Sequence, residues 1–91
     1  MTNIVIAGYA RSPFTFAGKG ALAKIRPDIM VAQVVAALVA RTGVKPDDIE
    51  DLIMGCAFPE GEQGFNIARL VTFQAGLPLG IAGVTINRFC G

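Results

Sequence analysis

Residues 66–91 read NIARLVTFQAGLPLGIAGVTINRFCG and combine the signals of a helix with those of a strand. The asparagine at their start can cap a helix over residues 66–75, which Gly76 would end. Residues 83–88 alternate apolar with polar side chains, as a strand with two different faces does, and they lead directly into Cys90. This stretch therefore predicts a helix that is followed at once by a strand.

Residues 28–42 form the clearest helix outside that stretch. Asp28 can cap its N-terminus, and Gly43 can supply the left-handed residue that commonly follows a helix. Between residues 29 and 40 only Gln33 is polar, so we expect this helix to be buried on most sides. These twelve residues are too few to cross a bilayer, which needs about 20.

The remaining elements complete an alternating pattern. Short apolar runs predict strands at residues 3–9 and 51–58, Gly- and Pro-containing stretches predict loops at 14–27 and 59–64, and Pro46 favours a turn or one helical turn at 45–49. The order is then strand, helix, strand, helix, strand. Such an order predicts an α/β fold with a parallel-biased sheet and right-handed crossovers.

Composition suggests that this fold is incomplete. The 91 residues are 53% apolar and only 16% charged, against roughly 25% charged in a typical soluble domain. A free-standing domain of this size buries only about 60% of the surface that its unfolded chain exposes, so it needs polar residues outside. We therefore expect residues 1–91 to be part of one domain that further protein completes. The alternative is a compact, unusually apolar domain.

Charge and cysteine usage exclude several classes of function. The net charge of +1 does not suggest nucleic acid or an anionic membrane as a partner. Histidine is absent, and Cys56 and Cys90 are far apart, so neither a common zinc pattern nor a Cys–His pair can form within the chain. No secretory signal pattern is visible. Free thiols in a reducing cytoplasmic setting fit best.

Cys90 is the candidate catalytic residue. It follows a strand and precedes Gly91, in the place where a sharp strand-to-helix turn lifts a nucleophile out of a sheet. Backbone N–H groups of a following helix would favour the thiolate and could hold an oxyanion. By position alone, however, a cysteine after a strand is more often a small buried apolar residue.

Five stretches together resemble the thiolase family, in its degradative 3-ketoacyl-CoA branch, and occur in the family's order. They are Ile4–Ile6 leading to Ala10–Phe14, Gly43–Ile49, Asp51–Cys56, Glu62–Arg69 and Val84–Gly91. The last two are the most specific, because Asn-Arg-x-Cys approaches the family's nucleophile, with Ile86 here in place of the common valine. The family nucleophile maps onto Cys90.

The resemblance implies the rest of the functional expectation. The fold would be a thiolase-like βαβαβ N-terminal segment of a mixed sheet covered by helices, completed by a C-terminal portion that is missing here or forms a separate chain. Assembled, it would act as an acetyl-CoA C-acyltransferase with acyl-CoA as substrate and coenzyme A as co-substrate, without a covalently bound cofactor or a metal. A histidine and a second cysteine would come from the C-terminal portion, so we expect the isolated chain to be inactive. The assembled enzyme would be a homodimer or tetramer, with residues 83–88 near the contact.

Two other functions stay open. One is a related condensing enzyme, such as a ketoacyl synthase, and the other is a non-catalytic thiolase-like subunit. The resemblance places Asn66 and Arg69 near the subunit contact and the approach to the active site, but they could equally be an N-cap and an ion-pair donor. We expect Cys56 to be a buried strand residue. Arg11 and Arg88 are assigned structural roles, with Asp51 or Glu62 as partners.

Overall fold

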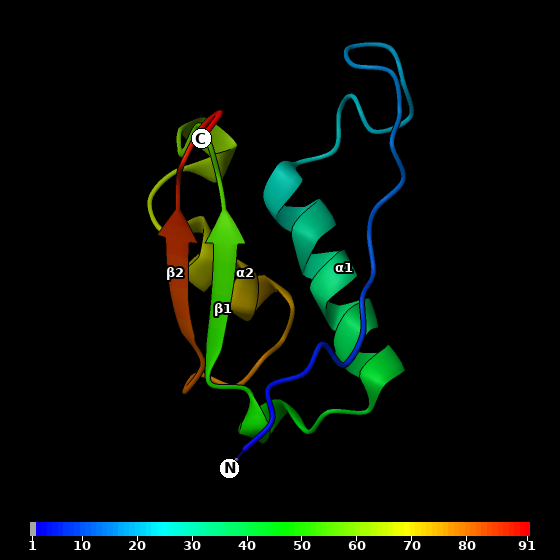
Figure 1. Ribbon diagram of the computed structural model, residues 1–91. Helices are drawn as coiled ribbons and strands as arrows, with labels where there is room; N and C mark the ends of the chain where they lie inside the picture. The colour runs from blue at the N-terminus through cyan, green and yellow to red at the C-terminus, as the bar shows by residue number, and fades with distance from the viewer. Residues whose placement is uncertain (1) are drawn as a thin grey trace.

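The computed structural model describes residues 2–91 and shows an α/β arrangement, so Met1 of the predicted domain lies outside the described residues. Its elements are α1 (Pro27–Thr42), η1 (Pro46–Asp48), β1 (Asp51–Gly55), η2 (Gly61–Gln63), α2 (Ile67–Gln74) and β2 (Ala82–Ile86), where η1 and η2 are single 3₁₀ turns. Figure 1 shows α2 behind the two strands and α1 to their side.

The two strands form a parallel pair that α2 connects. Their register runs from Asp51 opposite Ala82 to Gly55 opposite Ile86. Side chains alternate across this pair, as predicted: Thr85 is half-buried beneath α2, whereas Val84 and Ile86 share the exposed face. We call the exposed side of the pair, which carries Ile53, Val84 and Ile86, the open face of the sheet.

The core lies between the two helices and the inner side of the sheet. Ala32 of α1 and Ile67 and Val71 of α2 form its buried centre, and Leu52 and Met54 of β1 pack against them. Burial of a large apolar side chain such as Ile67 or Val71 contributes about 1.5–3 kcal/mol. The core therefore holds α1, α2 and β1 together.

The prediction of a strand at residues 3–9 is wrong, because the structure has no strand there. Among residues 2–91 the sheet contains β1 and β2 alone, while Ile4 and Ile6 are 98% and 94% exposed. The segment instead runs alongside α1 (Figure 1), where Arg41 donates a hydrogen bond to the carbonyl oxygen of Tyr9 at 2.8 Å. A strand needs a partner for its backbone N–H and C=O groups, and neither described strand pairs with this segment.

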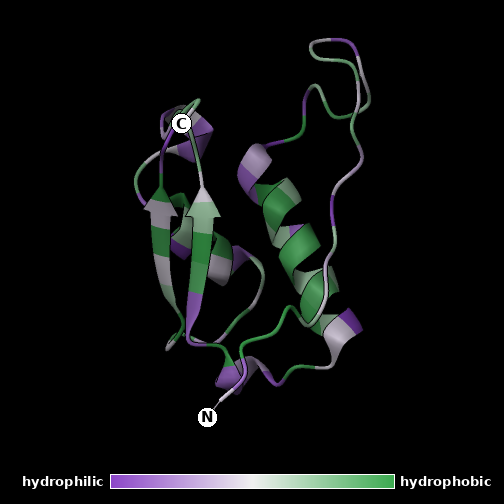
Figure 2. Ribbon diagram, viewed as in Figure 1, coloured by the Kyte–Doolittle hydropathy of each residue, from purple (hydrophilic) through white to green (hydrophobic). Residues whose placement is uncertain are grey.

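The helix α1 differs from its prediction in two respects. Asp28 is not the N-cap, because Arg26 occupies that position and Asp28 lies in the first turn. Most residues of the helix are hydrophobic (Figure 2), yet only Asp28 and Ala32 are buried. Its expected burial on most sides is therefore not provided by residues 2–91. Gly43 has the predicted left-handed conformation, with φ 71°, and its N–H bonds to the carbonyl oxygen of Val39.

The remaining boundaries shift by a few residues. The strand predicted at 51–58 ends at residue 55, and the one predicted at 83–88 spans residues 82–86. The turn expected at 45–49 is η1, and the loop expected at 59–64 contains η2. None of the helices within residues 2–91 has the length and apolar character needed to cross a membrane.

Candidate active site at the carboxyl ends of the strands

Cys90 is exposed, in a turn just beyond the carboxyl end of β2. In Figure 1 this end of the chain lies beyond the arrowheads of both strands. The residue before it, Phe89, has a positive φ of 44°, a conformation that costs a non-glycine residue about 1–3 kcal/mol unless its surroundings impose it. The carboxyl ends of parallel strands are where α/β proteins commonly bind ligands. Cys90 is therefore accessible, and the turn that carries it is strained.

The side-chain amide of Asn87 holds this turn through two hydrogen bonds, one at its oxygen and one at its nitrogen. Its Oδ1 accepts a hydrogen bond from the Phe89 N–H at 2.8 Å, and its Nδ2 donates to the Ala57 carbonyl oxygen at 2.9 Å. The turn closes through a further bond of 2.7 Å from the Gly91 N–H to the Arg88 carbonyl oxygen. Asn87 thus ties the segment after β2 to the segment after β1. Sequence reasoning missed this role, although asparagine is a frequent former of such turns.

The segment after β1 supports the same turn through an aromatic contact. The rings of Phe58 and Phe89 meet edge to face, with centroids 5.3 Å apart and planes at 88°. Gln63 of η2 donates to the Phe58 carbonyl oxygen at 2.9 Å and contacts the Cys56 Sγ at 3.5 Å. These contacts fasten residues 56–58 to η2.

Cys56 lies one residue past β1 and is half-buried, so the prediction of a buried strand residue was wrong in detail. Its N–H donates to the Ile86 carbonyl oxygen at 2.9 Å, and its side chain packs against the core. Both cysteines are free thiols. No group of three or more residues able to hold a metal ion occurs within residues 2–91.

Asn66 is the N-cap of α2, as predicted. Its Oδ1 accepts from the Arg69 N–H at 3.4 Å and from the Thr85 hydroxyl at 2.7 Å, and its Nδ2 donates to the Gly83 carbonyl oxygen at 2.8 Å. The Thr85 hydroxyl also accepts from the Ala68 N–H at 3.1 Å. The start of α2 is therefore joined directly to β2.

The predicted ion pairs of the arginines do not form among residues 2–91. Arg69 donates to the Ile81 carbonyl oxygen and stacks over the Phe73 ring at 4.4 Å. Glu62 pairs at 3.8 Å with Arg26 rather than with Arg11 or Arg88. Ion pairs of solvated side chains contribute little to stability, which explains why the sequence pattern could not select their partners.

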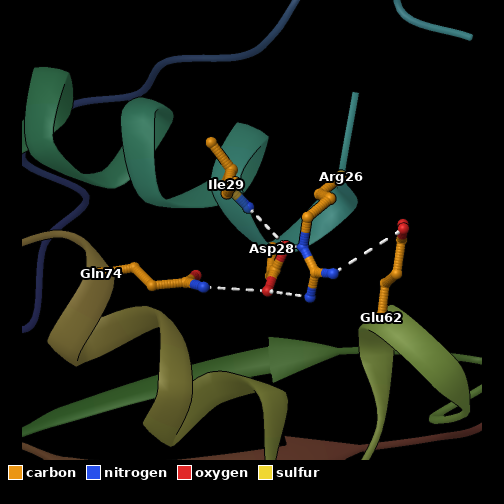
Figure 3. A network of polar contacts seen from close by, with 5 residues as sticks. All are labelled: Arg26, Asp28, Ile29, Glu62 and Gln74. Carbon is orange, nitrogen blue, oxygen red and sulfur yellow. Dashed lines mark hydrogen bonds and ion pairs between the residues drawn. The ribbon is translucent and has the colours of Figure 1, made fainter. Parts of the chain in front are cut away.

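Asp28 is the centre of a polar network that the sequence did not reveal (Figure 3). Only 3% of it is exposed, and it accepts both hydrogen bonds of a bidentate pair with Arg26 at 3.1 Å, together with one from Gln74 at 2.9 Å and one from the Ile29 N–H at 2.9 Å. The bonds from Arg26 and then Gln74 lower the pKa of Asp28 to about 2, against the opposing effect of burial. The network links α1 to α2 and, through Arg26 and Glu62, to η2.

Comparison with known proteins agrees with this arrangement. The family model for the N-terminal domain of thiolases matches residues 4–91. A 3-ketoacyl-CoA thiolase of Bacillus subtilis (strain 168) is 46% identical over 90 residues, which are 99% of this chain and 23% of that protein. A 3-ketoacyl-CoA thiolase of Saccharophagus degradans is 40% identical over 90 residues, with 98% and 23% covered.

The fold has a close match among solved structures. The crystal structure of the Bacillus anthracis acetyl-CoA acetyltransferase matches with a TM-score of 0.85 and 34% identity, over 94% of this chain and 21% of that chain. The chain spans about a quarter of the length of the curated relatives it matches. Since the family model for the N-terminal domain of thiolases covers nearly the whole chain, the chain belongs to the thiolase family.

Proposed function

We propose that this chain supplies the acyl-carrying cysteine of a thiolase, and that Cys90 is that residue. The observation that carries the proposal is the exposed position of Cys90 on a strained turn at the carboxyl ends of both strands. Membership of a family whose relatives are named 3-ketoacyl-CoA thiolase supports the reaction class. A thiol in that position is open to a substrate that approaches from beyond the strands.

The proposed reaction forms and breaks one bond at a time. The Cys90 thiolate attacks the β-keto carbon of a 3-ketoacyl-CoA and forms a carbon–sulfur bond. The bond between the α and β carbons then breaks, and its electron pair takes up a proton as acetyl-CoA leaves. The thiol of coenzyme A finally attacks the acyl-enzyme, which releases a shortened acyl-CoA and returns the cysteine. The reverse sequence is a Claisen condensation.

The resemblance to thiolases assigns the acid–base steps to a histidine and a second cysteine. This chain has no histidine, and its other cysteine, Cys56, packs against the core. We infer that a C-terminal thiolase portion, joined to this chain or separate from it, provides them and completes the domain. We call the two together the assembled enzyme. The apolar open face supports burial against more protein, and we propose a dimer or tetramer with β2 near the contact. A reducing, cytoplasmic setting would keep both thiols free.

The test is replacement of each cysteine in the assembled enzyme. We expect Cys90→Ala to lower thiolysis of a 3-ketoacyl-CoA by at least about 10³-fold, as loss of a nucleophile does. Mass spectrometry of the enzyme with substrate but without coenzyme A should find an acyl group on the peptide that contains Cys90. The matched control is Cys56→Ala, which removes a thiol of the same chain and should keep acylation.

The proposal would be wrong if Cys90→Ala kept full turnover and if iodoacetamide labelled Cys90 no faster than an ordinary thiol. That pair of results would favour a non-catalytic thiolase-like subunit. Acylation of Cys90 from an acyl donor, with condensation but no thiolysis, would instead favour a related condensing enzyme.

A further inference from the structure

We propose that Asn87 is a positioning residue, which sets the direction in which Cys90 projects from the end of β2. The inference rests on the proposed function of Cys90 as the nucleophile. The role assigned to Asn87 is exerted through the backbone of the turn, to which its amide bonds. Three observations carry it: the strain at Phe89, the two hydrogen bonds of the Asn87 amide, and the anchoring of the carbonyl group to which that amide donates.

The strain at Phe89 calls for a restraint. Its φ of 44° belongs to the left-handed region, which a bulky aromatic residue rarely adopts. Without a restraint the residue would relax to negative φ, and the peptide that follows it would rotate. Because Cys90 is the next residue, that rotation would change the direction of its Cα–Cβ bond. The restraint on Phe89 is therefore also a restraint on the thiol.

The Asn87 amide supplies this restraint through both of its polar atoms. The Oδ1 holds the Phe89 N–H at 2.8 Å, and the Nδ2 holds the Ala57 carbonyl oxygen at 2.9 Å. The first bond fixes the local turn, and the second prevents the side chain from rotating with it. The amide of asparagine presents an acceptor and a donor on one short planar group. Aspartate lacks the donor, and serine can imitate only the local bond.

The carbonyl group of Ala57, which accepts the bond from Asn87 just after β1, is itself held in place. The Cys56 N–H bonds to the Ile86 carbonyl oxygen at 2.9 Å and continues the strand pairing by one step. Gln63 holds the Phe58 carbonyl oxygen, and the Phe58 ring packs against the Phe89 ring. Residues 56–58 are thus fixed before and after the carbonyl group of Ala57. Asn87 therefore fixes the direction of the Cys90 side chain relative to the end of β1.

The experiment compares variants of Asn87 in the assembled enzyme. We expect Asn87→Ala to lower kcat for thiolysis by about 10- to 100-fold, the effect of a misplaced reacting group, with KM changed less than about threefold. Asn87→Ser, which keeps an acceptor for the Phe89 N–H, should fall between the wild type and the alanine variant. Reaction of Cys90 with iodoacetamide should change less than about threefold, since a small reagent needs no fixed direction of approach.

Gln74→Ala is the matched control, because it removes an amide that bonds to Asp28 in the network of Figure 3. It should lower the melting temperature and leave kcat unchanged. The inference is overturned if Asn87→Ala keeps kcat within twofold, or if both amide variants lower kcat equally. If the alanine variant does not fold, wild-type kcat in Asn87→Ser overturns it. In all these cases Cys90→Ala remains inactive, whereas an active Cys90→Ala refutes the proposed function itself.

Discussion

At the scale of single residues, Asp28 shows what a buried charge requires. A carboxylate removed from water is costly unless its oxygens are paired and hydrogen-bonded. Both Asp28 oxygens accept two bonds each, from Arg26, Gln74 and the Ile29 N–H. The ionised form is therefore favoured, and the pKa is lowered to about 2. The residue fastens the start of α1 rather than capping it.

Replacement of Asp28 by asparagine should show how much this charge stabilises the fold. We expect Asp28→Asn to lower the free energy of unfolding at pH 7 by about 1–3 kcal/mol. Because the folded-state pKa lies below the ordinary value of 3.8, the stabilisation is complete above that value and is lost as the pH falls toward 2. The two proteins should therefore converge in stability between pH 4 and 2, by urea unfolding monitored by circular dichroism.

The control for this prediction is Asp47→Asn, which changes an exposed carboxylate of η1. It should alter the unfolding free energy by less than about 0.5 kcal/mol, as exposed substitutions usually do. A difference between wild type and Asp28→Asn that stays constant from pH 7 to pH 2 would mean that the charge of Asp28 does not stabilise the fold.

At the scale of elements, the close approach of α2 to β2 depends on Gly83, which has no side chain. A Cβ atom built on Gly83 would lie 2.5 Å from the Arg69 backbone nitrogen and 2.6 Å from its Cα atom. These are atoms of the helix backbone, so no side-chain rotation can relieve the overlap. The bonds from Asn66 to Gly83 and Thr85 then hold the helix at this short separation. Glycine in the strand is thus a packing requirement.

The substitution Gly83→Ala should therefore push α2 away from β2. We expect the free energy of unfolding to fall by about 1–3 kcal/mol or more, the usual cost of overpacking, measured by thermal or urea unfolding. The matched control is Gly55→Ala in the partner strand, where no described atom lies within 4 Å of the added Cβ. Equal effects of the two substitutions would show that strand propensity, and not the close contact, sets the cost.

At the scale of the whole molecule, much apolar surface remains uncovered. The Cα radius of gyration is 14.1 Å and the longest dimension is 47 Å, whereas a compact chain of this length would have a radius of about 12 Å. The exposed apolar side chains include Ile4, Ile6, Phe14, Phe16, Ile53 and Ile86. Patches of this kind mark surfaces that contact other protein.

We expect the isolated 91-residue chain to self-associate and to lack thiolysis activity. The exposed side chains should bind a hydrophobic dye such as ANS, and sedimentation should detect species larger than the monomer. Introducing a charge at the open face with Ile53→Glu should reduce both signals, whereas Asp47→Asn should not. A monomeric chain that does not bind ANS, or thiolysis by the purified chain alone, would contradict this prediction.

Local patterns anticipated a substantial part of this structure. Asn66 and Gly43 act at helix ends as their side chains and backbone freedom predict, and the alternation predicted over residues 83–88 placed the two faces of β2 correctly. The position of Cys90 after a strand was readable in the same way. The errors at residues 3–9 and at Asp28 arise where the outcome depends on a partner. An apolar run does not specify which strand will pair with it, and an aspartate before a helix does not specify whether another helix will cover it.

The sequence by itself determined the two helices, the alternation of faces along β2 and the place of Cys90 after that strand, because each depends on neighbours within a few positions along the chain. It determined the family through motifs spread along most of its length. The tertiary structure alone decided that Asp28 is buried against Gln74, which is 46 residues away in the sequence. It alone also decided that Asn87 bonds to Ala57, which is 30 residues away. A hydrogen bond of an amide is directional and short, so its partner is selected by how the elements pack and not by the residue type.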